Sequence, residues 1–201
     1  MGDDKRESII ASALELFRNI GYHNTKVSDI VKAAGIAQGT FYLYFKSKED
    51  LFRQVVEACM DEIVGALDRT PSGSEELDGE TVMYRMIRQS LLEYYKNRNV
   101  LYLINRHGAD SPELSEVCKA YYGKLAQLII RTLKHYCVFP GYTEEQLEIE
   151  AYAKIGMVEK AAYHCFIDKG YGLEQVELVT EVLVGIDCGP CKPPGADGGL
   201  S

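Results

Sequence analysis

The chain has 201 residues, of which 46% are hydrophobic, so it is long enough for one or two domains with a buried core. No apolar run approaches the roughly 18 residues of a membrane span, and the charged start "MGDDKRES" predicts no signal peptide. The six widely spread cysteines are expected to be reduced thiols rather than a disulfide framework. These features predict a cytoplasmic protein.

The charge is distributed unevenly along the chain. The net charge is −8, but residues 1–50 contain seven basic and seven acidic side chains, so the remainder carries the whole imbalance. Between positions 18 and 48, Asp29 alone opposes five basic residues: Arg18, Lys26, Lys32, Lys46 and Lys48. Such a local basic patch is what a phosphate backbone would meet, although five basic residues are also common on a solvated surface.

The first fifty residues predict three short helices and the start of a fourth. Apolar residues recur at steps of three and four over 4–20, and Gly21 ends that helix. A second helix is expected over 25–34 with Thr25 as its N-cap, and a third over 37–44. In "SKED" (47–50), Ser47 and Asp50 read as a capping box for the fourth helix.

The rest of the chain is also predicted to be helical. "TPSGSEELDGE" (70–80) reads as a linker, and helices are expected over 80–97, 99–107, 112–137, 144–169 and 174–186. Their predicted breaks are "NRN", "GADSP", "FPGY" and "KGYG". The predicted fold class is all-α, with an N-terminal three-helix domain over 1–50, a helical bundle over 51–187, and a disordered Pro/Gly-rich tail over 188–201.

Residues 25–44 have the form of a helix-turn-helix. Gly35 supplies the positive φ that the turn needs, and Ala34 and Gly39 are expected to let the two helices cross closely. If Ile30, Ile36, Phe41 and Phe45 pack inward, the outward positions are Gln38, Thr40, Tyr42, Leu43 and Tyr44. Gln can read base edges, and hydroxyl groups can reach phosphate oxygens. A short helix with Tyr and Phe could also be ordinary core.

The segment "TKVSDIVKAAGIAQGTFYLYFKSKEDLF" (25–52) resembles the DNA-binding signature of TetR-family (tetracycline-repressor-like) transcriptional regulators. The resemblance covers roughly 8–55. It implies a homodimer that binds a palindromic double-stranded DNA operator through the third helix. It also implies release of the operator when a small molecule enters the C-terminal domain, with residues 144–186 forming the dimer interface.

Carried over by position, the resemblance implies base contacts from Gln38 and Tyr44. It implies phosphate contacts from five residues, Thr25, Lys26, Thr40, Tyr42 and Lys48, and places Gly39 within the same surface. Two positions depart from the family pattern: Ala37 stands where Ser is common and removes a capping hydroxyl, and Lys46 stands where Pro is common and is expected to loosen the turn.

The later helices suggest the effector site and the dimer interface. The middle helices are rich in Tyr, and seven residues could line a pocket for an apolar or aromatic effector: Tyr84, Tyr102, Arg106, His107, Cys118, Tyr121 and Tyr122. Residues 144–169 and 174–186 each carry an apolar side. By resemblance these sides form a four-helix dimer interface, and the alternative is that they close the domain's own core.

Other functions have weaker support in the sequence. Cys188 and Cys191 have the spacing of a redox or metal pair, which leaves a thiol- or metal-responsive regulator as the alternative, but no second pair completes a zinc set. No G-x-S-x-G, H-E-x-x-H, P-loop or Rossmann motif is present, so no enzyme, cofactor or metal site is expected. A helical adaptor that does not bind an operator is a third reading.

Overall fold

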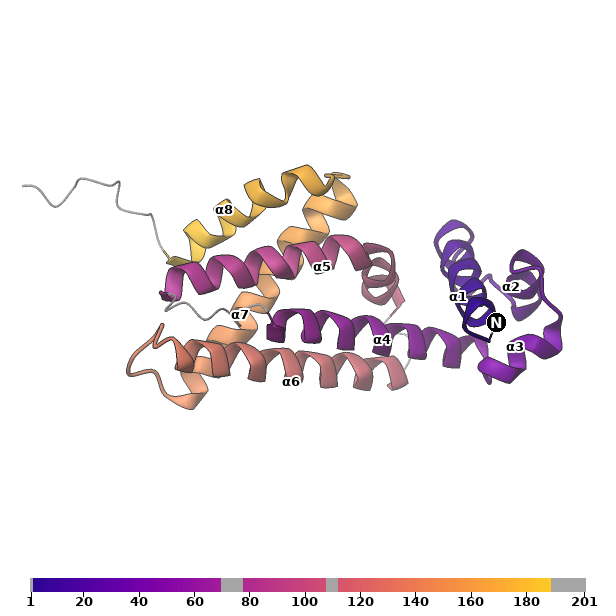
Figure 1. The fold of residues 1–201 in the computed structure, drawn as a ribbon, viewed down its shortest axis with the longest axis horizontal. Coiled ribbons are helices and arrows are strands. Elements are labelled where there is room, and N and C mark those ends of the chain that lie inside the picture. The colour runs from indigo at the N-terminus through magenta and orange to yellow at the C-terminus, as the bar shows by residue number, and fades with distance from the viewer. Residues whose placement is uncertain (1, 70–77, 108–111, 189–201) are drawn as a thin grey trace, which may run out of the picture. The chain divides into compact units, whose positions relative to one another are not determined.

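The computed structural model describes residues 2–69, 78–107 and 112–188, and every regular element in these ranges is a helix (Figure 1). The elements are α1 (Gly2–Asn19), α2 (Val27–Ala33), α3 (Gln38–Tyr44), α4 (Lys48–Arg69), α5 (Gly79–His107), α6 (Pro112–His135), α7 (Glu144–Ala162), a π-helical segment (Tyr163–Asp168), a 3-10 turn (Leu173–Gln175) and α8 (Val176–Cys188). This confirms the all-α prediction. None of these helices is both long enough and apolar enough to cross a membrane.

The described residues divide into two compact units. The first unit comprises residues up to 65 together with 96–124, and the second comprises 66–95 together with residues from 125 onward. The boundaries at 65, 95 and 124 fall inside α4, α5 and α6. These units are a geometric division, and the functional domains over 1–50 and 51–187 stay a prediction.

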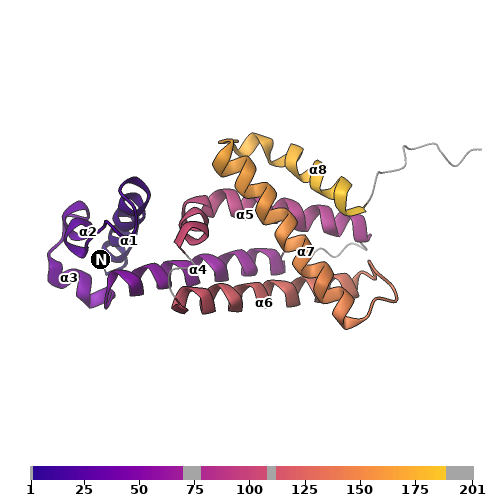
Figure 2. The same ribbon diagram turned by 180° about the vertical axis from the view of Figure 1, so that it is seen from behind.

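In the first unit, α1, α2 and α3 gather at the N-terminal end of α4 (Figures 1 and 2). The apolar face of α1 repeats every four residues, and Ile9, Ala13 and Phe17 are all buried. Phe17 packs edge-on against Phe52 of α4, with ring centroids 5.8 Å apart. This core holds the three short helices in place, although α2 and α3 have only seven residues each.

In the second unit, α7 and α8 contact each other and bury one side each. The buried positions form the apolar sides expected over 144–169 and 174–186: Leu147, Ala151, Ile155, Val158, Ala162 and Phe166, followed by Val176, Val179 and Leu183. Ile186 differs, because its side chain is 65% exposed. The named residues are therefore buried within the unit's own core, and the exposed apolar side chains of α7 and α8 lie at other positions.

Several helix boundaries differ from the sequence prediction. "NRN" does not break the chain, and α5 is continuous because Val100, Leu101 and Leu103 continue its buried face beyond Leu91 and Tyr94. The break at "FPGY" is present, and Thr143 caps α7 by accepting a hydrogen bond from Gln146 N. α8 extends to Cys188, one residue into the predicted tail. Most of the 70–80 linker and residues 189–201, which include Cys191, lie outside the described residues.

Candidate nucleic-acid interface

The turn between α2 and α3 is fixed by backbone hydrogen bonds. Gly35 has φ +65°, as predicted, and its N–H donates to Lys32 O (3.3 Å) while Ile36 N–H donates to Val31 O (3.0 Å). This pair of bonds is a Schellman motif, which ends α2 and redirects the chain into α3. Ala37 is the N-cap of α3 and makes no side-chain cap hydrogen bond, as expected for a residue without a hydroxyl.

Helix α3 has a buried face and an exposed face. Phe41 and Phe45 are buried, with ring centroids 5.7 Å apart. The opposite face consists of four exposed residues at adjacent helical positions: Gln38, Gly39, Tyr42 and Leu43. Thr40 and Tyr44 are half-buried at its flanks. We call these four exposed residues the recognition face.

For two members of the recognition face, the prediction from sequence was incomplete or wrong. Leu43 is 81% exposed, more than any other large hydrophobic side chain of the described residues. The sequence pattern predicts its outward position but indicates no contact for it. A Cβ added to Gly39 would meet no atom within 4 Å, so Gly39 does not serve a close crossing of α2 and α3 as expected. Its missing side chain leaves backbone open on the exposed side of α3.

The basic side chains of residues 26–48 are not equivalent. Lys26, Lys32 and Lys46 are exposed. The one acid of this stretch, Asp29, accepts the Lys26 backbone N–H at 2.9 Å through its Oδ2. Its charge therefore serves the N-terminus of α2, where Lys26, not Thr25 as predicted, is the N-cap.

Two of the expected phosphate contacts have internal roles. Thr25 is 1% exposed, and its hydroxyl donates to Gly21 O at 2.9 Å. Lys48 Nζ donates to Tyr22 O (2.8 Å) and to Thr25 O (3.0 Å), and it lies 4.4 Å from the centroid of the Tyr22 ring. The Thr25 hydroxyl therefore fixes the α1–α2 connection internally, and Lys48 ties that connection to the start of α4. A contact from either to phosphate does not fit this arrangement.

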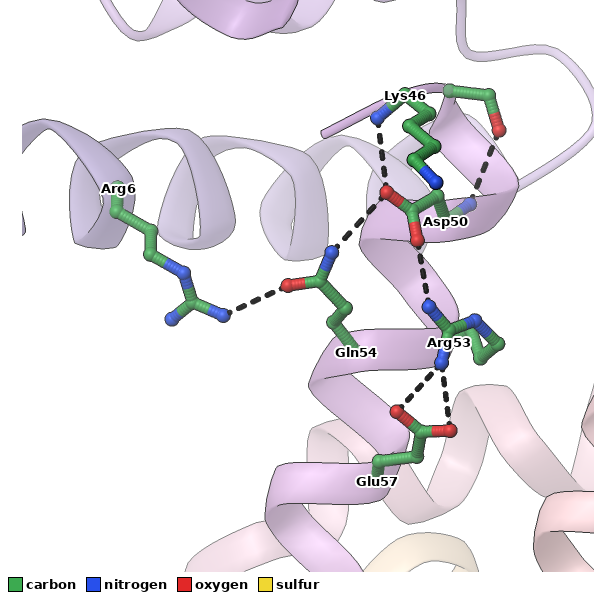
Figure 3. A network of polar contacts seen from close by, with 7 residues as sticks. Arg6, Lys46, Asp50, Arg53, Gln54 and Glu57 are labelled. Carbon is green, nitrogen blue, oxygen red and sulfur yellow. Dashed lines mark hydrogen bonds and ion pairs between the residues drawn. The ribbon is translucent and has the colours of Figure 1, made fainter. Parts of the chain in front are cut away.

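The junction between α3 and α4 is held by a polar network that the sequence only partly predicted (Figure 3). Ser47 Oγ accepts Asp50 N–H at 3.1 Å, which confirms its capping role. The Asp50 carboxylate accepts Lys46 N–H (2.9 Å), Gln54 Nε2 (3.1 Å) and Arg53 (2.8 Å). Proline at position 46 could not make the first bond, so Lys46 tightens this turn rather than loosening it.

Electrostatics at this junction follow from the same bonds. The Lys46 backbone N–H, helped by the side chains of Arg53 and Gln54, holds the pKa of Asp50 below its ordinary value. Gln54 Oε1 accepts Arg6 at 3.2 Å, and the Arg6 guanidinium lies 5.5 Å from the Phe45 ring centroid. The end of α3 is thus fixed to α1 and α4 at once, which orients the recognition face.

The residues predicted to line one effector pocket do not all come together. Tyr102, Arg106 and His107 share a hollow of about 360 Å³ with residues 17–24. Tyr121 lines a separate hollow of about 300 Å³ with α4 residues and packs against Tyr122 at 5.2 Å. Cys118 and Tyr122 line neither hollow. Tyr84 belongs to the second unit, where its hydroxyl donates to Glu177 at 2.8 Å.

Within the described residues, no group of three or more His, Cys, Asp or Glu side chains could hold a metal ion. The described thiols of Cys59, Cys118, Cys137 and Cys165 are not joined in disulfides. Cys188 ends α8, and its proposed partner Cys191 lies beyond the described range. The thiol- or metal-responsive alternative thus gains no support from the site.

A short helix presented by a tight turn, with a polar and apolar exposed face beside exposed basic side chains, defines a helix-turn-helix DNA-binding protein. Residues 9–55 match the family described as bacterial regulatory proteins, tetR family. This match and the relatives below support a TetR-family transcriptional regulator.

Relatives and solved structures agree with this assignment. The chain is 29% identical to the HTH-type transcriptional regulator YvdT of Bacillus subtilis over 178 residues, 87% of each chain. It is 41% identical to the fatty acid metabolism regulator protein of the same organism, over 32% of this chain and 33% of that one.

Among solved structures, a transcriptional regulator of Aquifex aeolicus has a TM-score of 0.72 at 22% identity, covering 92% of this chain and 98% of that one. The fatty acid degradation regulator FadR of Bacillus halodurans has a TM-score of 0.68 at 24% identity, with 90% and 95% covered. At these identities the structures show the shared fold.

Proposed function

We propose that this chain is a cytoplasmic repressor that binds a palindromic operator as a homodimer and releases it when a small effector binds. The observation that carries the proposal is the recognition face of Gln38, Gly39, Tyr42 and Leu43, exposed on a helix whose other side is locked into the core. The first fifty residues would bind DNA, and 51–187 would form the effector and dimer domain.

Three side chains of the recognition face and several neighbouring residues have chemical roles in this proposal. The Gln38 amide can donate to and accept from a base edge, as Gln does with adenine. Leu43 offers an apolar contact, which suits a thymine methyl group. The Tyr42 hydroxyl and the Lys26 ammonium, both on exposed side chains, would contact phosphate oxygens. Tyr44 for a base contact and Thr40 for a phosphate contact are weaker candidates, because both side chains are half-buried at the flanks of the recognition face.

The need for two subunits follows from the size of α3. A helix of seven residues reaches too few base pairs for a specific site, so two copies are needed in successive major grooves, about 34–36 Å apart. The second unit offers an apolar surface for pairing: Leu178, Val182 and Ile186 of α8 are each more than half exposed, as is Ile149 of α7.

The effector is proposed to have an apolar body. Some relatives are named as regulators of fatty acid metabolism, and the biofilm operon regulator IcaR of Staphylococcus epidermidis is named a negative transcriptional regulator. These names support an apolar effector and a repressor role for this chain.

The proposal is tested by separating base contacts from phosphate contacts. The operator is recovered by genomic pull-down, and affinities for it and for a scrambled duplex are measured by fluorescence anisotropy. Gln38→Ala should weaken operator binding about tenfold and leave the scrambled duplex almost unaffected, because a base contact is worth about 1–3 kcal/mol of discrimination.

Lys26→Ala should weaken binding to both duplexes alike and reduce the salt dependence by about one counterion. Lys119→Ala, at an exposed position on α6, serves as the matched control and should change neither affinity. If Gln38→Ala affected operator and scrambled duplex equally, or if no DNA were recovered, the proposed readout would be wrong.

A further inference from the structure

The hollow beside the α1–α2 connection is notable for its charge. It has a volume of about 360 Å³ and is lined by residues 17–24 and by four residues of α5, Tyr102, Leu103, Arg106 and His107. Two arginines and two histidines face it: Arg18, His23, Arg106 and His107. The twelve described residues that line it include no Asp or Glu, although the whole chain has a net charge of −8.

Contacts among the lining residues order several side chains of the hollow. Arg106 donates to the Tyr102 hydroxyl at 2.9 Å, which restricts the guanidinium, and the His23 and His107 rings lie edge to face with centroids 5.2 Å apart. Burial raises the pKa of Tyr22, with help from Glu49, which bonds its hydroxyl from outside the hollow. The Tyr22 phenol therefore stays neutral and adds no negative charge.

We propose that this hollow binds the effector, and that the effector is a small organic carboxylate with an aromatic or apolar body. The carboxylate would be met by Arg18 and Arg106, since planar guanidinium groups match its two oxygens. Tyr102 and Leu103 offer the apolar wall. A volume of this size lies at the lower end of small-molecule sites, and its concave form suits a small ligand better than a convex DNA backbone.

The hollow is connected to the DNA-binding helices through its own wall. Residues 20–24 line it, and the same segment leads into α2. Lys48 Nζ bonds to Tyr22 O and Thr25 O, so the connection is tied to the first residue of α4. A ligand that draws Arg18, in the last turn of α1, toward Arg106 would pull on this connection and displace α2 and α3, lowering operator affinity. This step rests on the proposed function.

Binding is tested with benzoate and with its neutral analogue benzamide, by isothermal titration calorimetry on the full chain. Benzoate should bind, and benzamide should bind at least tenfold more weakly because it lacks the charge. Arg18→Gln and Arg106→Gln should each weaken benzoate about tenfold, in line with the loss of a charge-assisted hydrogen bond. The exposed Arg69→Gln is the matched control and should bind benzoate as the unmodified chain does.

A second measurement locates the ligand without any variant. The chain has four histidines, and two of them, His135 and His164, are exposed and outside the hollow. On titration with benzoate, the ring-proton NMR signals of His23 and His107 should move, and those of His135 and His164 should not. Equal binding of benzoate and benzamide, absence of benzoate binding, or movement of all four signals alike would overturn the site.

DNA binding is read separately so that the two proposals can fail independently. With the recovered operator, benzoate should reduce affinity for the unmodified chain and not for Arg106→Gln. If the chain binds its operator and benzoate has no effect, the effector site is wrong while the DNA-binding function stands. If Arg106→Gln weakens operator binding when no benzoate is present, the hollow's cations serve DNA and the carboxylate site is rejected.

Discussion

At the residue scale, the basic side chains of the DNA-binding region divide into two kinds that composition does not distinguish. The Lys26 and Lys46 side chains are exposed, while the Lys48 ammonium donates to two backbone carbonyls and lies over the Tyr22 ring. Charge counting therefore overestimates the number of lysines that can meet phosphate.

Lys48→Ala is expected to destabilise the protein rather than to remove a DNA contact. It deletes two charge-assisted hydrogen bonds and a cation–π contact, so the free energy of unfolding should fall by about 2 kcal/mol. Urea unfolding followed by circular dichroism measures this. Lys46→Ala keeps the backbone N–H that bonds Asp50 and should leave stability unchanged. A similar loss of stability for Lys48→Ala and Lys46→Ala would contradict the distinction between an internally bonded and an exposed lysine.

Gly39→Ala should separate stability from DNA binding. A Cβ at position 39 meets no atom of the chain within 4 Å, and alanine favours the helix, so stability should rise by about 0.5–1 kcal/mol. Operator affinity should fall, because the new methyl group stands on the recognition face. Gly123→Ala in α6 meets equally open space and should stabilise the chain without affecting DNA binding. Unchanged operator affinity for Gly39→Ala would show that Gly39 is not part of the DNA interface.

At the scale of elements, the α3–α4 junction shows how a short helix is oriented. α3 makes two turns and has no side-chain cap at its N-terminus, so its own hydrogen bonds cannot fix its direction. Asp50 does so at the other end, by binding the Lys46 backbone and the first turns of α4 (Figure 3).

Asp50→Asn should destabilise the protein in a pH-dependent way. The folded state lowers the Asp50 pKa, so the stabilisation is fully present above the ordinary carboxyl range and is lost as the pH falls through the folded pKa. At pH 7 the variant should be less stable by about 1–3 kcal/mol. Urea unfolding at intervals between pH 7 and pH 3 should show the two proteins converging below about pH 4.

Asp61→Asn is the control for this experiment, because its carboxylate makes an exposed ion pair with Lys124 at 2.8 Å. Such pairs contribute little, so its effect should stay small at every pH. A difference between Asp50→Asn and the unmodified chain that persisted unchanged to pH 3 would show that the Asp50 charge is not the cause.

At the scale of the whole molecule, the second unit combines a closed core with an exposed apolar stripe. The buried and exposed sides of α8 follow helical periodicity, with Val176, Val179 and Leu183 inside and Leu178, Val182 and Ile186 outside. A solvent-exposed row of this kind on a helix is typical of an interaction surface, which is why the proposed homodimer uses it.

Val182→Glu should turn the proposed dimer into monomers. The substitution places a charge within the exposed stripe without touching the core, so the fold should survive while pairing is lost. Size-exclusion chromatography with light scattering measures the mass, and operator affinity should fall because one subunit reaches one half-site. Gln127→Glu, which adds the same charge at an exposed position on α6, is the control and should remain dimeric. If Val182→Glu remained dimeric, the dimer interface would have to lie outside this stripe.

The sequence by itself determined the class of fold, the helix-turn-helix and the inward positions of α3. Helical periodicity places Phe41 and Phe45 opposite Gln38 and Tyr42, and a positive φ in the turn favours a glycine such as Gly35, so local rules suffice. The same periodicity identified the apolar sides of α7 and α8. It could not tell whether those sides face the chain's own core or a second copy.

Only the tertiary structure decided what each polar side chain contacts. Lys48 bonds to Tyr22 and Thr25 of the α1–α2 connection, which are distant from position 48 in sequence, and the hollow joins that connection to α5. Such contacts depend on how separate helices meet. Sequence spacing describes one helix at a time, so partners that lie on different helices become visible only once the helices have packed.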